Sequence, residues 1–195
     1  SFGVAALAEA WGARVVARRR CGDDLQALER TAGEALERSD LVVVTGGASV
    51  GERDYAKAMF APYGLDLVFD KVALKPGKPV WLGRVGDVLV LGLPGNPTSA
   101  MVTARLFLAP LAAGLAGGDA GSALAWRALP LANRLAACPE RETFHRARLV
   151  DGRAWVLGDQ DSAAQAALAA ADLLVRRRAG DAAAEAAEPV DCLPL

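Results

Sequence analysis

The first 112 residues carry two kinds of apolar pattern, which alternate along the chain. In some segments apolar residues recur every three or four positions, the spacing of a buried helical stripe, and in others they form short runs typical of strands. The run at 41–44, Leu-Val-Val-Val, is apolar throughout, as in a central parallel strand covered on both faces. The expected helices cover residues 2–11, 25–38, 55–63 and 97–112, and the expected strands cover residues 13–17, 41–44, 67–72, 79–82 and 88–91.

Several helix ends carry recognisable signals. Gly12 stands where the residue after a helix C-terminus is expected. Asp23, with Gln26 three residues later, is a candidate N-cap for the second helix. Asn96 followed by Pro97 combines a favourable N-cap with proline at the first helical position, and so predicts the start of a long helix.

The pattern changes after residue 112. Four glycines between residues 114 and 121 predict a linker. Beyond it the chain favours short strands, and only the alanine run at 163–171 has helical character. We therefore predict an α/β domain over residues 1–117, with a mostly parallel sheet in three layers, and a small β-barrel-like domain over residues 122–195. The expected strands of the second domain cover residues 126–131, 143–149, 154–157 and 173–176.

Composition narrows the class of protein. With 195 residues, 53% of them hydrophobic and 23% charged, the chain can bury one large core, or one core and a smaller one. The net charge of −1 gives no reason to expect nucleic acid, so a basic site would have to be local. Cys21, Cys138 and Cys192 lack the spacing of a disulfide framework or zinc site, which favours a reducing, cytoplasmic location. No continuous apolar run has transmembrane length, so we expect no membrane partner.

Three turn sequences carry the strongest functional signal. They are TGGASVGERDY at 45–55, KPGKP at 75–79 and GLPGNPTS at 92–99. The first and third directly follow apolar runs and lead into helical segments, and in an open α/β sheet ligands bind where strand carboxyl ends and helix N-termini meet. The middle turn adds two lysines. Together these features predict a site for an anion, either a phosphate or another oxyanion.

These turns, in this order and spacing, resemble the molybdopterin molybdenumtransferases, the MoeA family, which includes the E domain of gephyrin. The resemblance continues at 141–146, Arg-Glu-Thr-Phe-His-Arg, and at 158–162, Gly-Asp-Gln-Asp-Ser, so it covers essentially the whole chain. It implies a molybdopterin-binding α/β domain followed by a β-barrel-like domain. It also implies an enzyme that inserts molybdate into adenylylated molybdopterin and releases AMP with the help of a divalent metal.

The chain also departs from the family pattern. Family members have a dimerisation region and a further small domain before this region, and their α/β domain begins with a strand that ends in a TGDE-like turn. Because none of these precedes residue 1, the chain resembles the C-terminal half of such an enzyme, with the first strand of the domain missing. The resemblance implies a homodimer for the full-length protein.

The first and third turns are expected to bind the pterin substrate. Gly46 and Gly47 allow backbone conformations that other residues avoid and let the chain approach a phosphate closely, while Ser49 can donate its hydroxyl. A plain turn at the glycines and a capping role for Asn96 are the structural alternatives. The expected pterin-binding residues are Gly46, Gly47, Ser49, Gly51, Pro94, Gly95, Asn96, Pro97 and Ser99.

The remaining candidates concern the metal and the oxyanion. Asp54 cannot favour an anion directly, so we predict that it is a Mg²⁺ ligand, with a helix N-cap as its alternative role. Lys75 and Lys78 are predicted to be catalytic with Asp54, because compact ammonium groups suit a small tetrahedral oxyanion such as molybdate. By resemblance, Arg141 and Ser162 complete the molybdate pocket. A strand-surface arginine and a turn serine explain those two residues equally well.

Two other functions stay open at this point. A domain of this type could bind molybdopterin or a nucleotide without inserting metal. It could also anchor the cytoplasmic loop of a membrane receptor, as a gephyrin-type scaffold does, although the sequence shows no peptide groove. His145 is the only histidine, and a single imidazole on a strand is more often structural than a general base.

Overall fold

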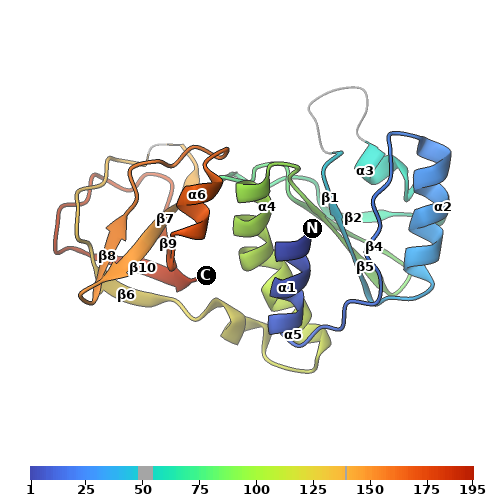
Figure 1. The fold of residues 1–195 in the computed structure, drawn as a ribbon, viewed down its shortest axis with the longest axis horizontal. Helices are drawn as coiled ribbons and strands as arrows, with labels where there is room; N and C mark the ends of the chain where they lie inside the picture. The colour runs from blue at the N-terminus through green and yellow to red at the C-terminus, as the bar shows by residue number, and fades with distance from the viewer. Residues whose placement is uncertain (48–54, 139) are drawn as a thin grey trace.

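The computed structural model describes residues 1–47, 55–138 and 140–195 (Figure 1). Its helices are α1 (Phe2–Ala10), α2 (Leu25–Leu36), α3 (Tyr55–Ala58), α4 (Pro97–Thr103), α5 (Ala109–Leu115) and α6 (Gln165–Ala169). Its strands are β1 (Leu41–Thr45), β2 (Asp66–Phe69), β3 (Leu74–Lys75), β4 (Trp81–Val85), β5 (Val88–Leu93), β6 (Arg127–Pro130), β7 (Glu142–Val150), β8 (Arg153–Val156), β9 (Leu173–Arg177) and β10 (Pro189–Pro194).

The first sheet is mixed in strand direction. Its order is β1-β5-β4-β2, with β1 and β5 parallel and the two other pairs antiparallel. The α/β class is confirmed, but the sheet is less parallel than the sequence pattern predicted. The reason is local, because only Gly86 and Asp87 connect β4 to β5 and so short a turn joins antiparallel neighbours.

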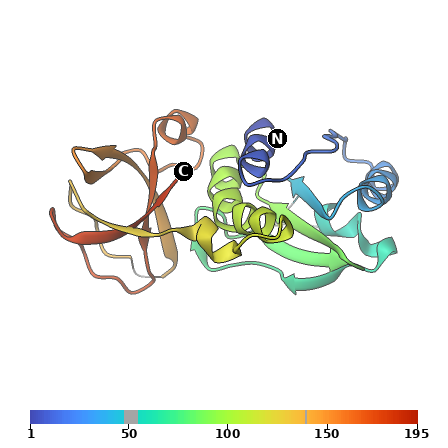
Figure 2. The same cartoon turned by 90° about the horizontal axis from the view of Figure 1, so that it is seen from below.

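The sheet lies between helices on its two faces (Figures 1 and 2). Along β5, Leu91 points into a cluster that includes Val4 of α1, whereas Val90 points into a second cluster with Ala32 of α2. Alternate residues of a strand face opposite sides, so this strand supplies both cores. The three layers expected from the sequence are therefore present.

Three local expectations were wrong. Residues 13–17 form no strand, since an isolated extended segment gains no ladder hydrogen bonds and no described residues pair with it. The N-cap of α2 is Asp24, not Asp23, and its carboxylate accepts hydrogen bonds from the backbone N–H groups of Gln26 and Ala27. The helix expected at 55–63 is split into α3 and a 3₁₀ turn at Ala61–Tyr63, where Pro62 cannot continue an α-helical ladder.

The long helix predicted after Asn96 is confirmed. It runs over Pro97–Leu115 and contains one π-helical turn at Ala104–Leu108, just before Pro110, whose ring removes a backbone donor. By length and composition it is the one helix in the described part of the chain that could cross a membrane, and 61% of its most apolar window is buried within the protein. Its packing against the sheet and the second domain accounts for this apolar composition.

The C-terminal part is rich in strands, as predicted. Its sheet has the order β3-β7-β9-β10-β6, and β8 pairs with β7. An isolated bridge between Leu131 and Ala154 also brings the end of β6 beside β8, so the strands curl toward a barrel without a continuous ladder around it. The sequence pattern missed β10, which begins and ends with proline, a residue that is uncommon inside strands.

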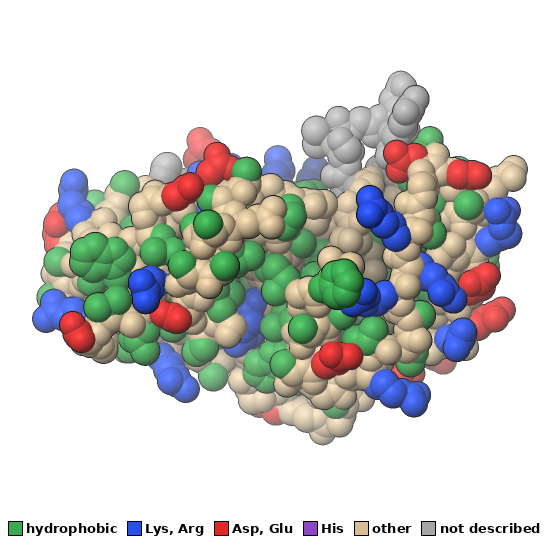
Figure 3. Space-filling view, in the orientation of Figure 1, with side chains coloured by type: hydrophobic (Ala, Val, Ile, Leu, Met, Phe, Trp, Pro, Cys, Tyr) green, Lys and Arg blue, Asp and Glu red, His purple; other side chains and the backbone are tan. Residues whose placement is uncertain are grey.

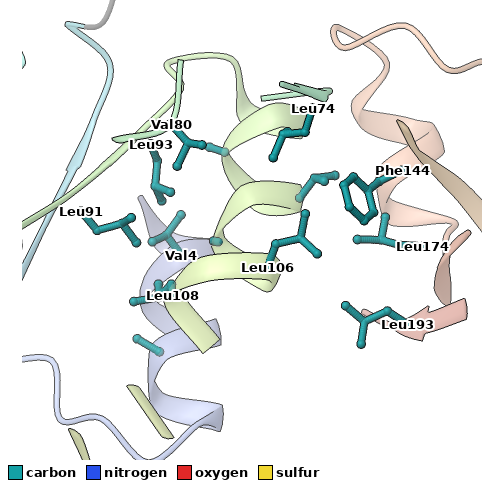
Figure 4. Packing of buried hydrophobic residues seen from close by; sticks show 14 residues of the cluster. Val4, Leu74, Val80, Leu91, Leu93, Leu106, Leu108, Phe144, Leu174 and Leu193 are labelled. Carbon is teal, nitrogen blue, oxygen red and sulfur yellow. The ribbon is translucent and has the colours of Figure 1, made fainter. Parts of the chain in front are cut away.

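The two parts share one core. Leu106 of the long helix packs with Phe144, Leu174 and Leu193 of the second sheet, while Leu108 belongs to the same cluster on the side of α1 (Figure 4). In addition, β3, which belongs to the KPGKP region, pairs in parallel with β7. The domain division at residues 117 and 122 stays a prediction, but the structure joins the two parts by more than the linker.

Candidate functional site

The first and third turns meet at the carboxyl ends of two adjacent parallel strands. Thr45 at the end of β1 pairs with Leu93 at the end of β5, and the N–H of Gly46 donates to the carbonyl of Leu93 at 3.3 Å. Gly46 and Gly47 have φ angles of +87° and +74°. A Cβ atom placed on Gly95 would lie 3.2 Å from the Cα of Gly46. Glycine at both positions therefore permits the close approach of the two turns.

The start of the long helix lies beside this contact. The Asn96 side chain accepts a hydrogen bond from the N–H of Ser99 at 3.2 Å, so its capping role is confirmed. Thr98 is completely buried, and its hydroxyl has no hydrogen-bond partner in the described part of the chain. Sequence reasoning missed Thr98, although it lies inside the third turn motif. Pro94 and Ser99 are buried, and Gly95 and Pro97 are exposed.

The KPGKP turn is seated between the long helix and the second sheet. Lys75 is paired with Thr143 of β7, and a Cβ atom on Gly77 would lie only 2.2 Å from Cγ2 of Thr103 in α4. The backbone of the turn is thus fixed against two elements. Lys75 and Lys78 are both exposed, which leaves their ammonium groups accessible to a ligand.

The two candidates from the second domain lie on segments that approach the same region. Arg141, half-buried, immediately precedes β7, whose first residues pair with Leu74 and Lys75. Ser162 lies just before α6, and α6 contacts α4 (Figure 1). Arg146 and Gln160 belong to the two motifs quoted at 141–146 and 158–162, but sequence reasoning gave neither a role of its own. In the structure they hydrogen-bond to each other, and Arg146 also donates to carbonyls of the turn that carries Ser162.

We call the residues 45–47, 75–79 and 94–99 the turn cluster. The structure brings these three segments to the N-terminal half of the long helix, as the sequence predicted for the glycine turns. Ser49, Gly51 and Asp54 lie outside the described residues. Their assigned roles, like those of the other candidate ligands, stay predictions.

His145 lies on β7 and is half-buried near several cationic side chains. Burial lowers the pKa of His145 to about 4, and the neighbouring charges of Arg177, Lys75 and Arg146 act in the same direction. The imidazole is therefore neutral at pH 7. On the face seen in Figure 3, basic and acidic side chains are interspersed.

This half-buried histidine predicts an acid-sensitive contribution to stability. The folded-state pKa of about 4 lies below the ordinary value of 6.5, so the unfolded chain takes up a proton first as the pH falls. The contribution of His145 to the free energy of unfolding should therefore decrease between pH 6.5 and 4, by up to about 3 kcal/mol, and stay constant below that range. Denaturant titrations across this range should show a shallower decrease in His145→Gln. Equal slopes in both proteins would contradict the assignment.

A second basic region of the C-terminal part is not a candidate anion site. It is a hollow of about 290 Å³ lined by Arg177 and Arg178 among other residues. Arg178 is paired with Asp191 at 2.8 Å, and Arg177 with Asp181 at 3.4 Å. Both carboxylates also line this hollow, so the positive charges of Arg177 and Arg178 are neutralised within it.

Comparison with known families gives the same division as the fold. A family profile described as "Probable molybdopterin binding domain" matches residues 2–113, more than half of the chain. A second profile, "MoeA C-terminal region (domain IV)", matches residues 128–195. The chain belongs to the MoeA family.

Individual relatives agree with this membership. The chain is 46% identical over 83 residues to a molybdopterin molybdenumtransferase of Haemophilus influenzae, covering 43% of this chain and 20% of the relative. It is 35% identical over 92 residues to the Bacillus subtilis protein of the same name, covering 47% of this chain and 21% of that one. The matched region is thus about a fifth of these relatives.

Solved structures share the fold. The molybdopterin biosynthesis moeA protein from Pyrococcus horikoshii aligns over 100% of this chain and 46% of its own, with a TM-score of 0.81 and 18% identity. A molybdenum cofactor biosynthesis protein from Pyrococcus furiosus aligns over 100% of this chain and 63% of its own, with a TM-score of 0.78 and 18% identity. At this identity the agreement concerns the fold. This MoeA-family chain therefore has both parts arranged as in those proteins.

Proposed function

We propose that this MoeA-family chain acts in molybdenum cofactor biosynthesis, where it inserts molybdate into adenylylated molybdopterin and releases AMP. The observation that carries the proposal is the turn cluster, in which a glycine turn, a helix N-terminus and a lysine-bearing turn lie together. The three free cysteines favour a reducing compartment, so we place the reaction in the cytoplasm. We expect the full-length protein to act as a homodimer.

The pterin substrate is assigned to the glycine turns and the start of α4. Gly46 and Gly95 let the two turns lie against each other, and the first N–H groups of the long helix favour negative charge. The hydroxyl of Thr98, in the first turn of this helix, has no partner among the described residues, although it is completely buried. These groups would hold and orient the phosphates without any covalent step.

Molybdate is assigned to Lys75, Lys78, Arg141 and Ser162. The two ammonium groups and the guanidinium neutralise the oxyanion and the charge that develops as the pyrophosphate is cleaved. Bringing both substrates to one end of the long helix converts their encounter into a reaction within a complex. The main contributions of the chain are thus charge neutralisation and proximity.

We assign no reaction step to Mg²⁺. In the described part of the chain no group of three or more His, Cys, Asp or Glu side chains could hold a metal ion. Asp54, the predicted ligand, lies outside the described residues. Its role as a Mg²⁺ ligand is part of the proposal, and the substitution Asp54→Asn tests it in the assay below.

The proposal is tested by reconstituting the reaction. Adenylylated molybdopterin, molybdate and Mg²⁺ are added to the full-length protein that carries these residues, and AMP and active cofactor are measured. We expect AMP release that saturates with molybdate. If neither AMP nor cofactor forms, the enzymatic assignment is wrong.

A binding module is the second candidate. The profile that matches residues 2–113 is described as a probable molybdopterin binding domain, and binding alone requires only the first and third turns. Calorimetry separates the two functions. Tight pterin binding without molybdate-dependent AMP release would favour the module.

A further inference from the structure

We propose that Arg146 and Gln160 are positioning residues that hold Ser162 in place for the oxyanion. We call this pair the Arg146–Gln160 latch. The inference rests on the proposed function, because it assigns Ser162 to the molybdate pocket. Neither Arg146 nor Gln160 is proposed to contact a substrate. Both act on the molybdate pocket through the turn at 158–162, which carries Ser162.

Gln160 ties the turn to the backbone of β7. Its Oε1 accepts from the backbone N–H of Arg146 at 3.0 Å, and its Nε2 donates to the carbonyl of the same residue at 3.0 Å. The same Nε2 also donates to the carbonyl of Leu157 at 2.7 Å. Such side chain to backbone pairing imitates a strand neighbour, so the turn is fixed beside the sheet although it belongs to no strand.

The guanidinium of Arg146 holds the turn through several contacts at once. Nη1 donates to the carbonyl of Asp161 at 3.0 Å and Nη2 to the carbonyl of Asp159 at 3.2 Å, while Nε lies 3.4 Å from Oε1 of Gln160. Three consecutive residues of the turn are thus held by one rigid, planar group. A lysine could keep the charge but could not reach these separate acceptors in a fixed geometry.

The burial of Arg146 indicates a geometric role. The residue is only 1% exposed, and burial lowers its pKa while the charges of Asp159 and Asp161 raise it. A buried charge with this set of partners contributes little net stability compared with a packed apolar side chain. What the guanidinium supplies is orientation of the turn.

The fixed turn is connected to the turn cluster. The Asp161 carboxylate accepts from the N–H of Ala163 at 2.7 Å, and its carbonyl accepts from the N–H of Ala164 at 3.0 Å, so the chain on both sides of Ser162 is constrained. Directly afterwards α6 begins, and α6 contacts α4. The latch therefore sets the position of Ser162 relative to the start of the long helix.

The test uses Arg146→Lys in the full-length protein. We expect the molybdate concentration for half-maximal AMP release to rise about ten-fold or more, because a small displacement of a positioned group has a large kinetic effect. The dissociation constant of the pterin substrate should change by less than about two-fold, since the glycine turns bind it. Hydrogen exchange at the N–H groups of Asp161 and Ala163 should become faster. Gln160→Ala, which keeps the guanidinium, should show the same changes.

Arg105→Lys is the matched control. Arg105 is also buried, and its guanidinium also donates to backbone carbonyls, those of Ala123 and Pro194, both at 2.7 Å. Arg105→Lys should lower the free energy of unfolding, as Arg146→Lys does. It should leave the molybdate concentration for half-maximal AMP release unchanged.

The outcomes separate the two proposals. If the wild-type protein shows no molybdate dependence, the proposed function is wrong and the latch with it. If AMP release by the wild-type protein saturates with molybdate, and Arg146→Lys changes this molybdate dependence no more than Arg105→Lys does, the proposed function stands and the positioning role of the latch is wrong. A selective loss of molybdate affinity together with faster exchange in the turn supports it.

Discussion

Replacing Lys75 or Lys78 with alanine is expected to raise the molybdate concentration for half-maximal AMP release by about one to two orders of magnitude. Each substitution removes a charge-assisted contact of roughly 1.5 to 3 kcal/mol if the ammonium group binds the oxyanion. Both side chains are exposed, so the free energy of unfolding should change by less than about 0.5 kcal/mol. Steady-state kinetics at varied molybdate, combined with denaturant unfolding, measures both quantities.

Lys71→Ala is the matched control for this experiment. Lys71 is an exposed lysine of the same connecting segment, and it is not assigned to the oxyanion. Its replacement should leave molybdate dependence unchanged. Because the charge of Lys75 lowers the pKa of His145, Lys75→Ala should also raise that pKa, which nuclear magnetic resonance of the single histidine can report. If Lys75→Ala and Lys78→Ala both keep the molybdate dependence of the wild-type protein, the two lysines do not bind the oxyanion and are solvated loop residues.

Gly77→Ala is expected to destabilise the protein by about 3 to 5 kcal/mol. Gly77 has a φ angle of +119°, and the added Cβ would lie 2.2 Å from Cγ2 of Thr103 and 3.0 Å from Cδ1 of Leu74. Thr103 is completely buried, and its hydroxyl donates to the carbonyl of Ser99 at 2.7 Å, so the side chain cannot rotate away cheaply. Thermal unfolding should show a midpoint about 10 °C lower.

Two further variants separate the causes of this loss. Thr103→Ser removes the methyl group that collides but keeps the hydroxyl, so Gly77→Ala should cost less in that background. Gly152→Ala introduces a side chain at a φ angle of +74° with no atom within 4 Å, and it measures backbone strain alone. If Gly77→Ala is no worse than Gly152→Ala, the KPGKP turn is not seated on α4 as described.

Much of the local structure could be predicted because its causes are local. Asn96 and Pro97 start a helix through their own capping and backbone geometry, and the structure has the helix there. The apolar run at 41–44 does form strand β1, and Gly46 beyond it has the positive φ angle that the turn requires. The prediction of a central strand covered on both faces was wrong, because β1 is at the end of the described sheet order and its four apolar residues are only half-buried. The family resemblance, based on these same turns, was confirmed by the two matching profiles.

The errors have a different origin. Residues 13–17 have a strand-like pattern, but a strand exists only where another strand accepts its hydrogen bonds. Asp23 and Asp24 are equally good capping residues in sequence, and the path of the backbone into α2 selects the second. The sheet was predicted to be mostly parallel, but only β1 and β5 are parallel, because apolar content reports burial and not the neighbour with which a strand pairs. The pairing of the segments at 79–82 and 88–91 around their glycine-containing loop did follow from the sequence and is confirmed.

By itself the sequence determined most helices and strands and the glycine turns, since these depend on residues close together in the chain, and the order of its motifs determined the family. Only the tertiary structure decided that Lys75 pairs with β7 across the domain division and that Gly77 is packed against Thr103. The hydrogen bonds from the guanidinium of Arg146 to the turn at 158–162 were likewise visible only in the tertiary structure. Those contacts join residues distant in sequence, and their energies depend on shape and on hydrogen-bond geometry, which a pattern of residue types along the chain does not contain.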